Sequence, residues 1–186
     1  FWGRLAAKLA GVPVVLSALH STGWPDSVGK LNRLLTPLTD GFIGVADAHA
    51  QHLVEREGFP SEKVFTIYNG IDVQRFEPQD GVKVREELGI PNEARVVSIL
   101  AALRPEKNHE FFLTAAKQIK QAQPKSHFVV IGDGPRRAEL EELTVELSLE
   151  DCTHFVGSRS DVPQLLAASN AVALTSHNEA SPVSIL

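Results

Sequence analysis

The sequence holds a single cysteine, Cys152, and no methionine among its 186 residues. One cysteine excludes an internal disulfide, so a reducing, cytoplasmic setting is the expected one. Methionine is absent even at position 1, and helical patterns are cut at both Phe1 and Leu186. These features indicate a piece of a longer chain.

Positive charge and long apolar runs are also scarce. The net charge of -5 gives no support to nucleic acid as a partner. No uninterrupted apolar stretch is long enough to span a bilayer. Arg4 and Lys8, followed by apolar residues, imitate a signal peptide, but their helical spacing and the break at Gly11–Pro13 favour a helix followed by a strand. The hydrophobic content of 43% is that of an ordinary globular protein.

Short apolar runs alternate with segments of helical periodicity along the chain. Strands are expected at residues 13–19, 39–46, 64–68, 95–100, 127–131, 154–156 and 171–174. Helices are expected at residues 1–10, 28–36, 82–88, 108–121, 135–147 and 162–167, with one more capped by Asp47 and another beginning at Ser181. This alternation predicts α/β architecture: two doubly wound parallel sheets with right-handed crossovers, joined through the polar segment Asp72–Gly81.

The segment Thr175–Leu186, TSHNEASPVSIL, follows an apolar run that predicts a buried strand. Ser181 and Pro182 suit the start of a helix, and free N–H groups at such a start bind anions. Glu179 stands just before that start, where a phosphate would repel it, so its carboxylate is expected to meet hydroxyl groups. Sugar plus phosphate is the ligand that this pattern suggests.

A second loop between a strand and a helix reads LRPEKN and contains Arg104 and Lys107. The guanidinium of Arg104 and the ammonium of Lys107 are suited to clamping a diphosphate. The alternative is a solvated loop in which Asn108 caps the next helix. The hexapeptide alone does not favour one over the other.

Two further loops contain glycines. In GDGPRR, the position of the third glycine in a dinucleotide fingerprint holds Arg137, so Gly132 and Gly134 favour a turn that brings backbone near a ligand over a nicotinamide site. In VGSRSDV, Gly157, Ser158 and Arg159 follow a predicted strand. The alternative there is a tight turn with Asp161 as a helix N-cap.

His20 ends the predicted strand 13–19 and opens a polar loop. The carboxyl end of a strand is the usual ligand edge of a parallel sheet. A lone histidine is nevertheless more often structural than catalytic, and both interpretations stay open on the residue alone.

Taken in this order, LRPEKN, VIGDGP, FVGSRSDV and SHNEASPVSIL resemble the C-terminal domain of glycosyltransferase family 4. The segment Asn69–Asp72, with Arg75, Phe76 and Pro78, resembles the stretch that leads into that domain. The likeness covers Pro13–Leu186 and is stronger after Tyr68. It implies the GT-B fold, two Rossmann-like doubly wound parallel-sheet domains, both truncated here. Residues 1–76 would belong to the acceptor-side domain and residues 77–186 to the domain that binds nucleotide-sugar.

The resemblance also implies a function, that of a retaining glycosyltransferase acting on a nucleotide-sugar donor and an acceptor glycan, lipid or small molecule. His20 would face the transferred sugar, and Glu179 would bind its hydroxyls as the first glutamate of an E-x7-E pattern whose second would follow Leu186. Position 180 is often glycine in the family and is alanine here. The donor diphosphate would be bound by Arg104, Lys107, Ala180 and Ser181. The nucleotide would lie near Gly132, Gly134, Gly157, Ser158 and Arg159.

No cofactor and no metal are expected, since cationic side chains would neutralise the diphosphate. We expect a cytoplasmic protein at or near the inner face of the membrane, with peripheral association through N-terminal segments absent here, and we expect the fragment itself to be inactive. Three alternatives stay open. They are a GT-B sugar-nucleotide epimerase, a non-catalytic protein that keeps the fold and binds sugar-nucleotide, and, least favoured, a nicotinamide-dependent oxidoreductase.

Overall fold

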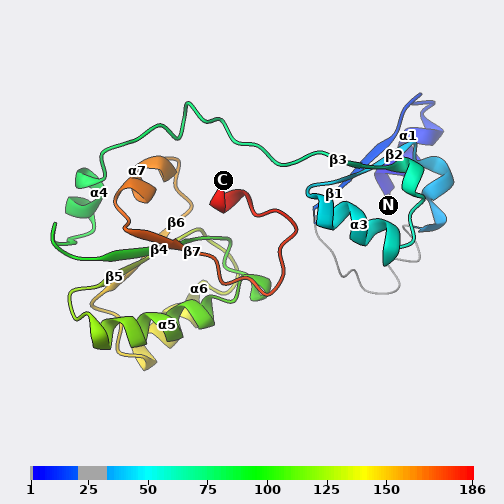
Figure 1. The fold of residues 1–186 in the computed structure, drawn as a ribbon. Helices are drawn as coiled ribbons and strands as arrows, with labels where there is room; N and C mark the ends of the chain where they lie inside the picture. Colours follow the sequence, from blue (N-terminus) through cyan, green and yellow to red (C-terminus); the bar gives the residue numbers. More distant parts are fainter. Residues whose placement is uncertain (1, 21–32) are drawn as a thin grey trace. The chain divides into compact units, whose positions relative to one another are not determined.

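The structure is a computed structural model that describes residues 2–20 and 33–186. The chain folds into two compact units (Figure 1). The first unit comprises Phe1–Ile71 with Asn178–Ser184 and Leu186, and the second comprises Asp72–His177 with Ile185. Each unit is built on its own parallel sheet.

The first unit contains a three-stranded parallel sheet in the order β1-β2-β3. The strands are β1 (Leu16–Leu19), β2 (Gly41–Gly44) and β3 (Val64–Thr66). The other elements are α1 (Trp2–Leu9), η1 (Thr36–Leu38), α3 (Asp47–Glu55) and η2 (Ser61–Lys63). Helix α3 packs against β2 and β3, which buries Leu53 in the core.

The core of the first unit is small and centred on Phe42, whose ring lies 4.2 Å from that of Phe59 between centroids. Arg4 of α1 is also buried. Its guanidinium lies 5.9 Å from the centroid of the Phe42 ring and donates a hydrogen bond of 3.3 Å to Thr39 Oγ1. The stem of a long cationic side chain thus fills part of the core while its head keeps polar partners.

The second unit has a four-stranded sheet in the order β6-β5-β4-β7, with every pair parallel. The strands are β4 (Val96–Leu100), β5 (His127–Ile131), β6 (Thr153–Gly157) and β7 (Ala171–Ala173). The helices are α4 (Val82–Glu87), α5 (His109–Ala122), α6 (Arg137–Glu146) and α7 (Val162–Ala167). Figure 1 shows α5 and α6 on one face of this sheet and α4 and α7 on the other.

Both faces of the second sheet are covered because the strand β5 is apolar on both sides. Phe128 and Val130 point into the core with Phe112 and Leu140 from the α5 and α6 layer. Val129 and Ile131 belong to the opposite core, together with residues of α4 and α7. The predicted α/β fold of doubly wound parallel sheets is therefore confirmed.

The end of the chain differs from the expectation of a helix that begins at Ser181 and Pro182. The structure has a 3₁₀ turn, η4 (Val183–Ile185), with Pro182 at its N-cap position and no side-chain cap. Its closing bond runs from Leu186 N to Val183 O at 3.2 Å. The carbonyl oxygen of Ser181 accepts a bond from Asn69 Nδ2 instead, at 2.8 Å.

Elsewhere most predicted elements are present with shifted limits. The strand 127–131 and the helix 162–167 have the predicted bounds. The strand predicted at 13–19 is regular only from Leu16 to Leu19. Residues 28–32 of the helix predicted at 28–36 lie outside the described part of the chain, as does the loop that follows His20.

Candidate functional site

Three loops meet at the carboxyl edge of the sheet in the second unit, after β4, β5 and β6. Backbone hydrogen bonds join them: Leu103 N donates to Asp133 O at 3.0 Å, and Gly132 N donates to Gly157 O at 2.9 Å. Arg136 N also donates to Leu103 O at 3.3 Å. The loops that the sequence singled out separately therefore form one continuous surface.

Two glycines make this close approach feasible. Gly132 has a φ of +137°, and a Cβ atom there would lie 2.1 Å from the carbonyl oxygen of Ala101. A Cβ atom on Gly134 would lie 2.6 Å from Leu103 O. Such distances are far inside van der Waals contact, so only glycine fits both positions. The neighbour that each glycine approaches is the loop after β4; approach to a ligand stays a prediction.

An open pocket of about 290 Å³ lies on this surface. It contains three of the predicted nucleotide-proximal residues, Gly132, Ser158 and Arg159. The remaining lining residues are Leu100, Ala101, Ala102, Ile131, Asp133 and Val162. A mainly apolar floor with a few polar groups is typical of a site for a small organic ligand. Gly134 and Gly157 help to shape the loops but do not line the pocket.

The Arg159 side chain is held by two carboxylates. Its Nε and Nη2 atoms each donate to Asp161 at 2.8 Å, and Nη1 and Nη2 donate to Glu87 of α4 at 2.6 and 3.0 Å. Hydrogen bonds from Arg159 lower the pKa of Glu87 and of Asp161, while those two acceptors raise the pKa of Arg159. Its charge is therefore already compensated.

The interaction with Arg159 also explains why the Asp161 side chain does not cap helix α7. Asp161 occupies the N-cap position of α7, as the alternative interpretation of this loop expected, but its side chain makes no capping bond. It binds the guanidinium of Arg159 instead. Both kinds of bond are charge-assisted, but the guanidinium offers Asp161 two parallel bonds with a fixed geometry, so the arginine is the preferred partner.

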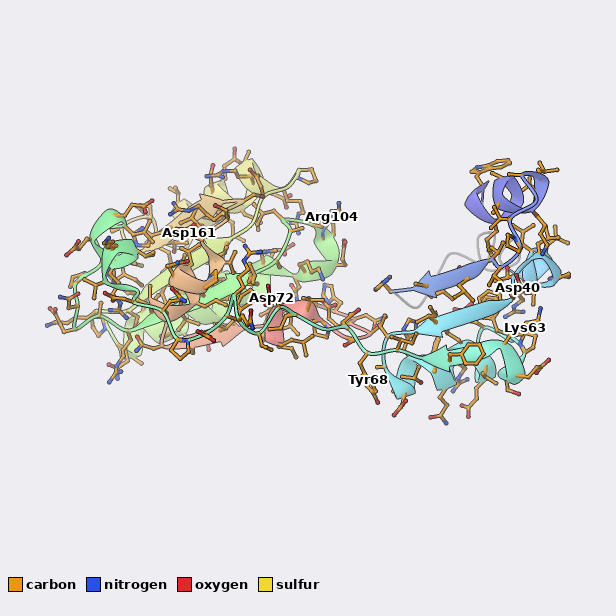
Figure 2. The ribbon with its side chains drawn as sticks, turned by 90° about the horizontal axis from the view of Figure 1, so that it is seen from above. Asp40, Lys63, Tyr68, Asp72, Arg104 and Asp161 are labelled. Carbon is orange, nitrogen blue, oxygen red and sulfur yellow. The ribbon has the colours of Figure 1, made fainter. Side chains whose placement is uncertain are left out.

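Arg104, labelled in Figure 2, lies in the loop after β4. Its partners differ from those of Arg159. Arg104 precedes the 3₁₀ turn η3 (Pro105–Lys107) and is exposed. Within residues 33–186 its guanidinium has no ion-pair partner. Lys107 ends the same turn and is half-buried. An uncompensated guanidinium two positions after Ala102, which lines the pocket, is suited to binding an anion.

Asn108 was the suggested helix cap in the solvated-loop interpretation of LRPEKN. It stands at the N-cap position of α5, with φ 51° and ψ 51°, but its side chain makes no capping bond. The left-handed conformation of Asn108 instead turns the chain from η3 into α5. Asparagine tolerates this region better than most residues.

The segment after β7 rests on the η3 turn. Thr175 Oγ1 donates to Lys107 O at 3.0 Å, and His177 N donates to Glu106 O at 3.0 Å. The start of TSHNEASP and the loop LRPEKN are thus adjacent in space. Glu179, Ala180 and Ser181, further along the same segment, are half-buried and group with the first unit.

Comparison with known proteins identifies the chain. Residues 82–186 match the family "Glycosyl transferases group 1", and residues 1–75 match "Glycosyltransferase Family 4". The chain belongs to glycosyltransferase family 4. The resemblance deduced from the sequence motifs is therefore confirmed.

Two relatives of this chain are about twice as long. It is 30% identical over 197 residues to UDP-Gal:alpha-D-GlcNAc-diphosphoundecaprenol alpha-1,3-galactosyltransferase of Escherichia coli, matching 99% of this chain and 51% of that protein. It is 28% identical to a D-inositol 3-phosphate glycosyltransferase of Saccharomonospora viridis, over 95% of this chain and 46% of that protein. The chain spans about half the length of each.

Solved structures agree with this assignment. The crystal structure of Anabaena HepE in complex with UDP-glucose aligns with a TM-score of 0.81 at 27% identity, over 96% of this chain and 50% of that one. WaaG, a glycosyltransferase involved in lipopolysaccharide biosynthesis, aligns with a TM-score of 0.78 at 16% identity and so supports the fold alone.

The first unit has its own carboxyl edge. His20 follows β1 directly and is exposed. Tyr68 lies beyond β3 (Figure 2). Its Oη atom donates to Asp47 Oδ2 at 2.6 Å, and this bond, with one from Thr66, lowers the pKa of Asp47. Asp47 was expected to cap a helix, but it is the first residue of α3 and its side chain makes no capping bond. Nothing in the sequence pointed to the Tyr68 pair.

Metal ligands and membrane-spanning helices are both missing from the described part of the chain. No group of three or more His, Cys, Asp or Glu side chains in residues 2–20 and 33–186 is arranged to hold a metal ion. None of the helices in those ranges has the length and apolarity needed to cross a bilayer. The expectation of metal-independent chemistry stays a prediction.

Proposed function

We propose that the protein to which this chain belongs is a retaining glycosyltransferase that moves a hexose from a UDP-sugar to a hydroxyl of a glycan, lipid or small-molecule acceptor. The observation that carries the proposal is the carboxyl edge of the second sheet. There an open pocket and an uncompensated arginine lie on three hydrogen-bonded loops. Family membership supports the reaction class. The E. coli relative is named for UDP-Gal and HepE binds UDP-glucose, which supports uridine as the base.

In this proposal the pocket beside Gly132, Ser158 and Arg159 receives the nucleotide. Because the guanidinium of Arg159 is already taken by two carboxylates, we infer that backbone groups of its loop contact the base. Arg104 and Lys107 bind the diphosphate, together with the N–H groups of Ala180 and Ser181. Glu179 accepts hydrogen bonds from the sugar hydroxyls.

Catalysis then rests on charge stabilisation. The bond between the anomeric carbon and the phosphate oxygen breaks, and a bond from that carbon to the acceptor oxygen forms on the same face. The acceptor proton passes to the leaving phosphate oxygen. Fixed positive charge from Arg104 and Lys107 lowers the energy of the developing phosphate charge. His20 positions the transferred sugar, and no side chain acts as a covalent nucleophile.

The test is a panel of UDP-, GDP- and ADP-sugars offered to the intact protein with EDTA present, measuring both binding and donor hydrolysis. We expect a UDP-sugar to bind, to be hydrolysed slowly, and to be unaffected by the chelator. Binding without turnover, even with candidate acceptors present, would favour a non-catalytic member of the family. Loss of activity on chelation would refute the metal-independent mechanism. No binding of any donor would refute the proposal as a whole.

A further inference from the structure

The chain enters the second unit through a polar segment, residues 72–81, that we call the strap. It is ordered by its own short turns rather than by a helix or strand. Gln74 N donates to Asp72 Oδ1 at 3.1 Å, Arg75 N donates to Asp72 O at 3.1 Å, and Val82 N donates to Asp80 Oδ1 at 2.9 Å. These hydrogen bonds fix the backbone conformation around Arg75, and so the position from which its side chain extends.

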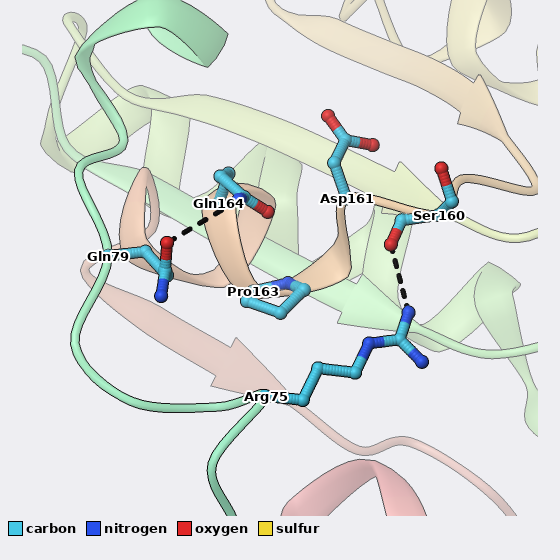
Figure 3. Close-up of a pocket in the computed structure, with 6 residues that line it drawn as sticks. All are labelled: Arg75, Gln79, Ser160, Asp161, Pro163 and Gln164. Atoms are coloured by element: carbon cyan, nitrogen blue, oxygen red, sulfur yellow. Dashed lines mark hydrogen bonds between the residues drawn. The ribbon is translucent and has the colours of Figure 1, made fainter.

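Arg75 fastens the strap to the loop between β6 and α7. Its Nη2 atom donates to the carbonyl oxygen of Ser160 at 2.9 Å, as Figure 3 shows. The guanidinium carbon also lies 5.9 Å from the centroid of the Phe76 ring. Further along, the strap contacts helix α7 rather than the loop, because Gln164 Nε2 donates to Gln79 Oε1 at 3.5 Å.

The residues that make these contacts also line an open pocket of about 250 Å³ beside the strap, separate from the pocket beside Gly132. Figure 3 shows its lining, and Asp161 and Pro163 contribute to it along with the four residues just described. The loop residues Ser160 and Asp161 therefore face the strap pocket, while Ser158 and Arg159 line the proposed nucleotide pocket. One short loop forms a wall of both.

The loop is held from three sides. Arg75 fixes the Ser160 carbonyl from the strap, Glu87 fixes the Arg159 guanidinium from α4, and Asp161 fixes it from the start of α7. A loop ordered before its ligand arrives does not lose that conformational freedom on binding, so prior anchoring raises affinity. Glu87 and Asp161 act on a side chain; Arg75 acts directly on the backbone.

We propose that Arg75 is a positioning residue for the donor nucleotide, acting through the Ser158–Ser160 backbone and never touching the donor. The inference rests on the proposed function, since it takes the pocket beside Ser158 and Arg159 as the base site. It predicts that Arg75 contributes to the binding affinity for the nucleoside part of the donor and not to the affinity for its diphosphate.

The experiment measures the dissociation constants of UDP, uridine and pyrophosphate by calorimetry on the intact protein. Four proteins are compared: wild type, Arg75→Ala, Arg75→Lys and the matched control Gln79→Ala, which alters the same strap at its contact with α7. We expect Arg75→Ala to weaken UDP and uridine by the same factor, about threefold, as for one hydrogen bond. Pyrophosphate binding and the thermal midpoint stay at wild-type values. Arg75→Lys, which keeps a donor for the carbonyl, recovers part of the loss, and Gln79→Ala binds as wild type.

Different results separate the two proposals. Wild-type protein that binds no UDP would refute the proposed function and this inference with it. Wild-type protein that binds UDP, with Arg75→Ala equal to it for uridine, would refute only the positioning role. An equal loss for pyrophosphate would show that Arg75 contacts phosphate directly, and an equal loss in Gln79→Ala would show a general effect of the strap; each overturns the inference. Because the Arg75 side chain is exposed, the alanine variant is expected to fold.

Discussion

The loops at the carboxyl edges of the two sheets are held together by different kinds of interaction. In the second unit the loops are joined backbone to backbone, with Gly132 and Gly134 packed against the carbonyls of Ala101 and Leu103. In the described part of the first unit, the loops after β2 and β3 are joined by a side-chain pair, Tyr68 and Asp47, besides one backbone bond from Ile67 N to Gly44 O. A backbone-built edge keeps its shape whatever side chains it displays, whereas an edge held by side chains changes with them.

The largest effect should follow from breaking the backbone-built edge with Gly132→Ala. The new Cβ would lie 2.1 Å from Ala101 O at a φ of +137°, so we expect a loss of about 2–4 kcal/mol in the free energy of unfolding. The control is Gly70→Ala in the first unit, where nothing lies within 4 Å of the added carbon. Urea denaturation measures both. Equal midpoints for the two variants would contradict the proposed tight packing.

The next effect distinguishes the two arginines at the carboxyl edge of the second sheet, Arg104 and Arg159. Arg104→Ala removes an uncompensated charge, so transfer should fall by about 10- to 100-fold with the thermal midpoint unchanged. Arg159→Ala leaves Glu87 and Asp161 unpaired, so its main effect should be on stability, of about 1 kcal/mol. Steady-state kinetics and thermal melts of the two variants measure this contrast. A reversed pattern would assign the phosphate to Arg159.

A smaller effect on the reaction is expected from Glu179→Ala in the intact protein. Lost hydrogen bonds to the sugar should reduce transfer by about tenfold, corresponding to roughly 1.4 kcal/mol. Glu150→Ala, an exposed change in the second unit, is the control. A folded Glu179 variant with unchanged transfer would remove this residue from the site.

The smallest expected effect is a loss of folding stability at low pH. It arises at the amino edge of the second sheet, opposite the carboxyl edge compared above. His127 Nδ1 and His154 Nε2 lie 3.0 Å apart at the start of β5 and β6. Burial lowers the pKa of both, with further lowering from Lys120 and Arg85 at His127 and from His127 at His154. Below the unfolded value of about 6.5, the unfolded chain binds protons that the folded chain does not.

Stability is therefore complete above about pH 6.5 and declines as the pH falls towards the folded pKa values. Thermal midpoints measured from neutral pH to about pH 5 should fall more steeply for wild type than for His154→Gln, which keeps a polar partner but cannot titrate. Parallel curves for the two proteins would contradict this account.

The regular elements were predictable because their signal lies in adjacent residues. The apolar run 127–131 and the helix 162–167 have the predicted limits. Strand 13–19 was predicted too long because apolar Val14 is 61% exposed and lies outside the ladder. The domain limits 1–76 and 77–186, and the roles of the site residues, stay predictions.

The capping assignments were less predictable. Asp47, Asn108 and Asp161 all stand at helix starts, yet none caps with its side chain. Asp47 and Asp161 instead bind Tyr68 and Arg159, partners that come from the packed fold. The ion pair between Glu87 and Arg159 joins residues 72 positions apart, so no local sequence pattern indicates it. Long-range pairs of this kind decide which arginine is available for a ligand. Their pairing cannot be predicted from a single sequence.

The backbone hydrogen bonds that join the loops after β4, β5 and β6 have a consequence for engineering. Ala102 and Ser158 line the pocket, yet neither side chain takes part in the bonds that join the loops. These two positions can therefore be randomised together while the glycines are kept, which gives a small library on an unchanged scaffold. Screening that library against purine and pyrimidine donors offers a route to altered donor choice.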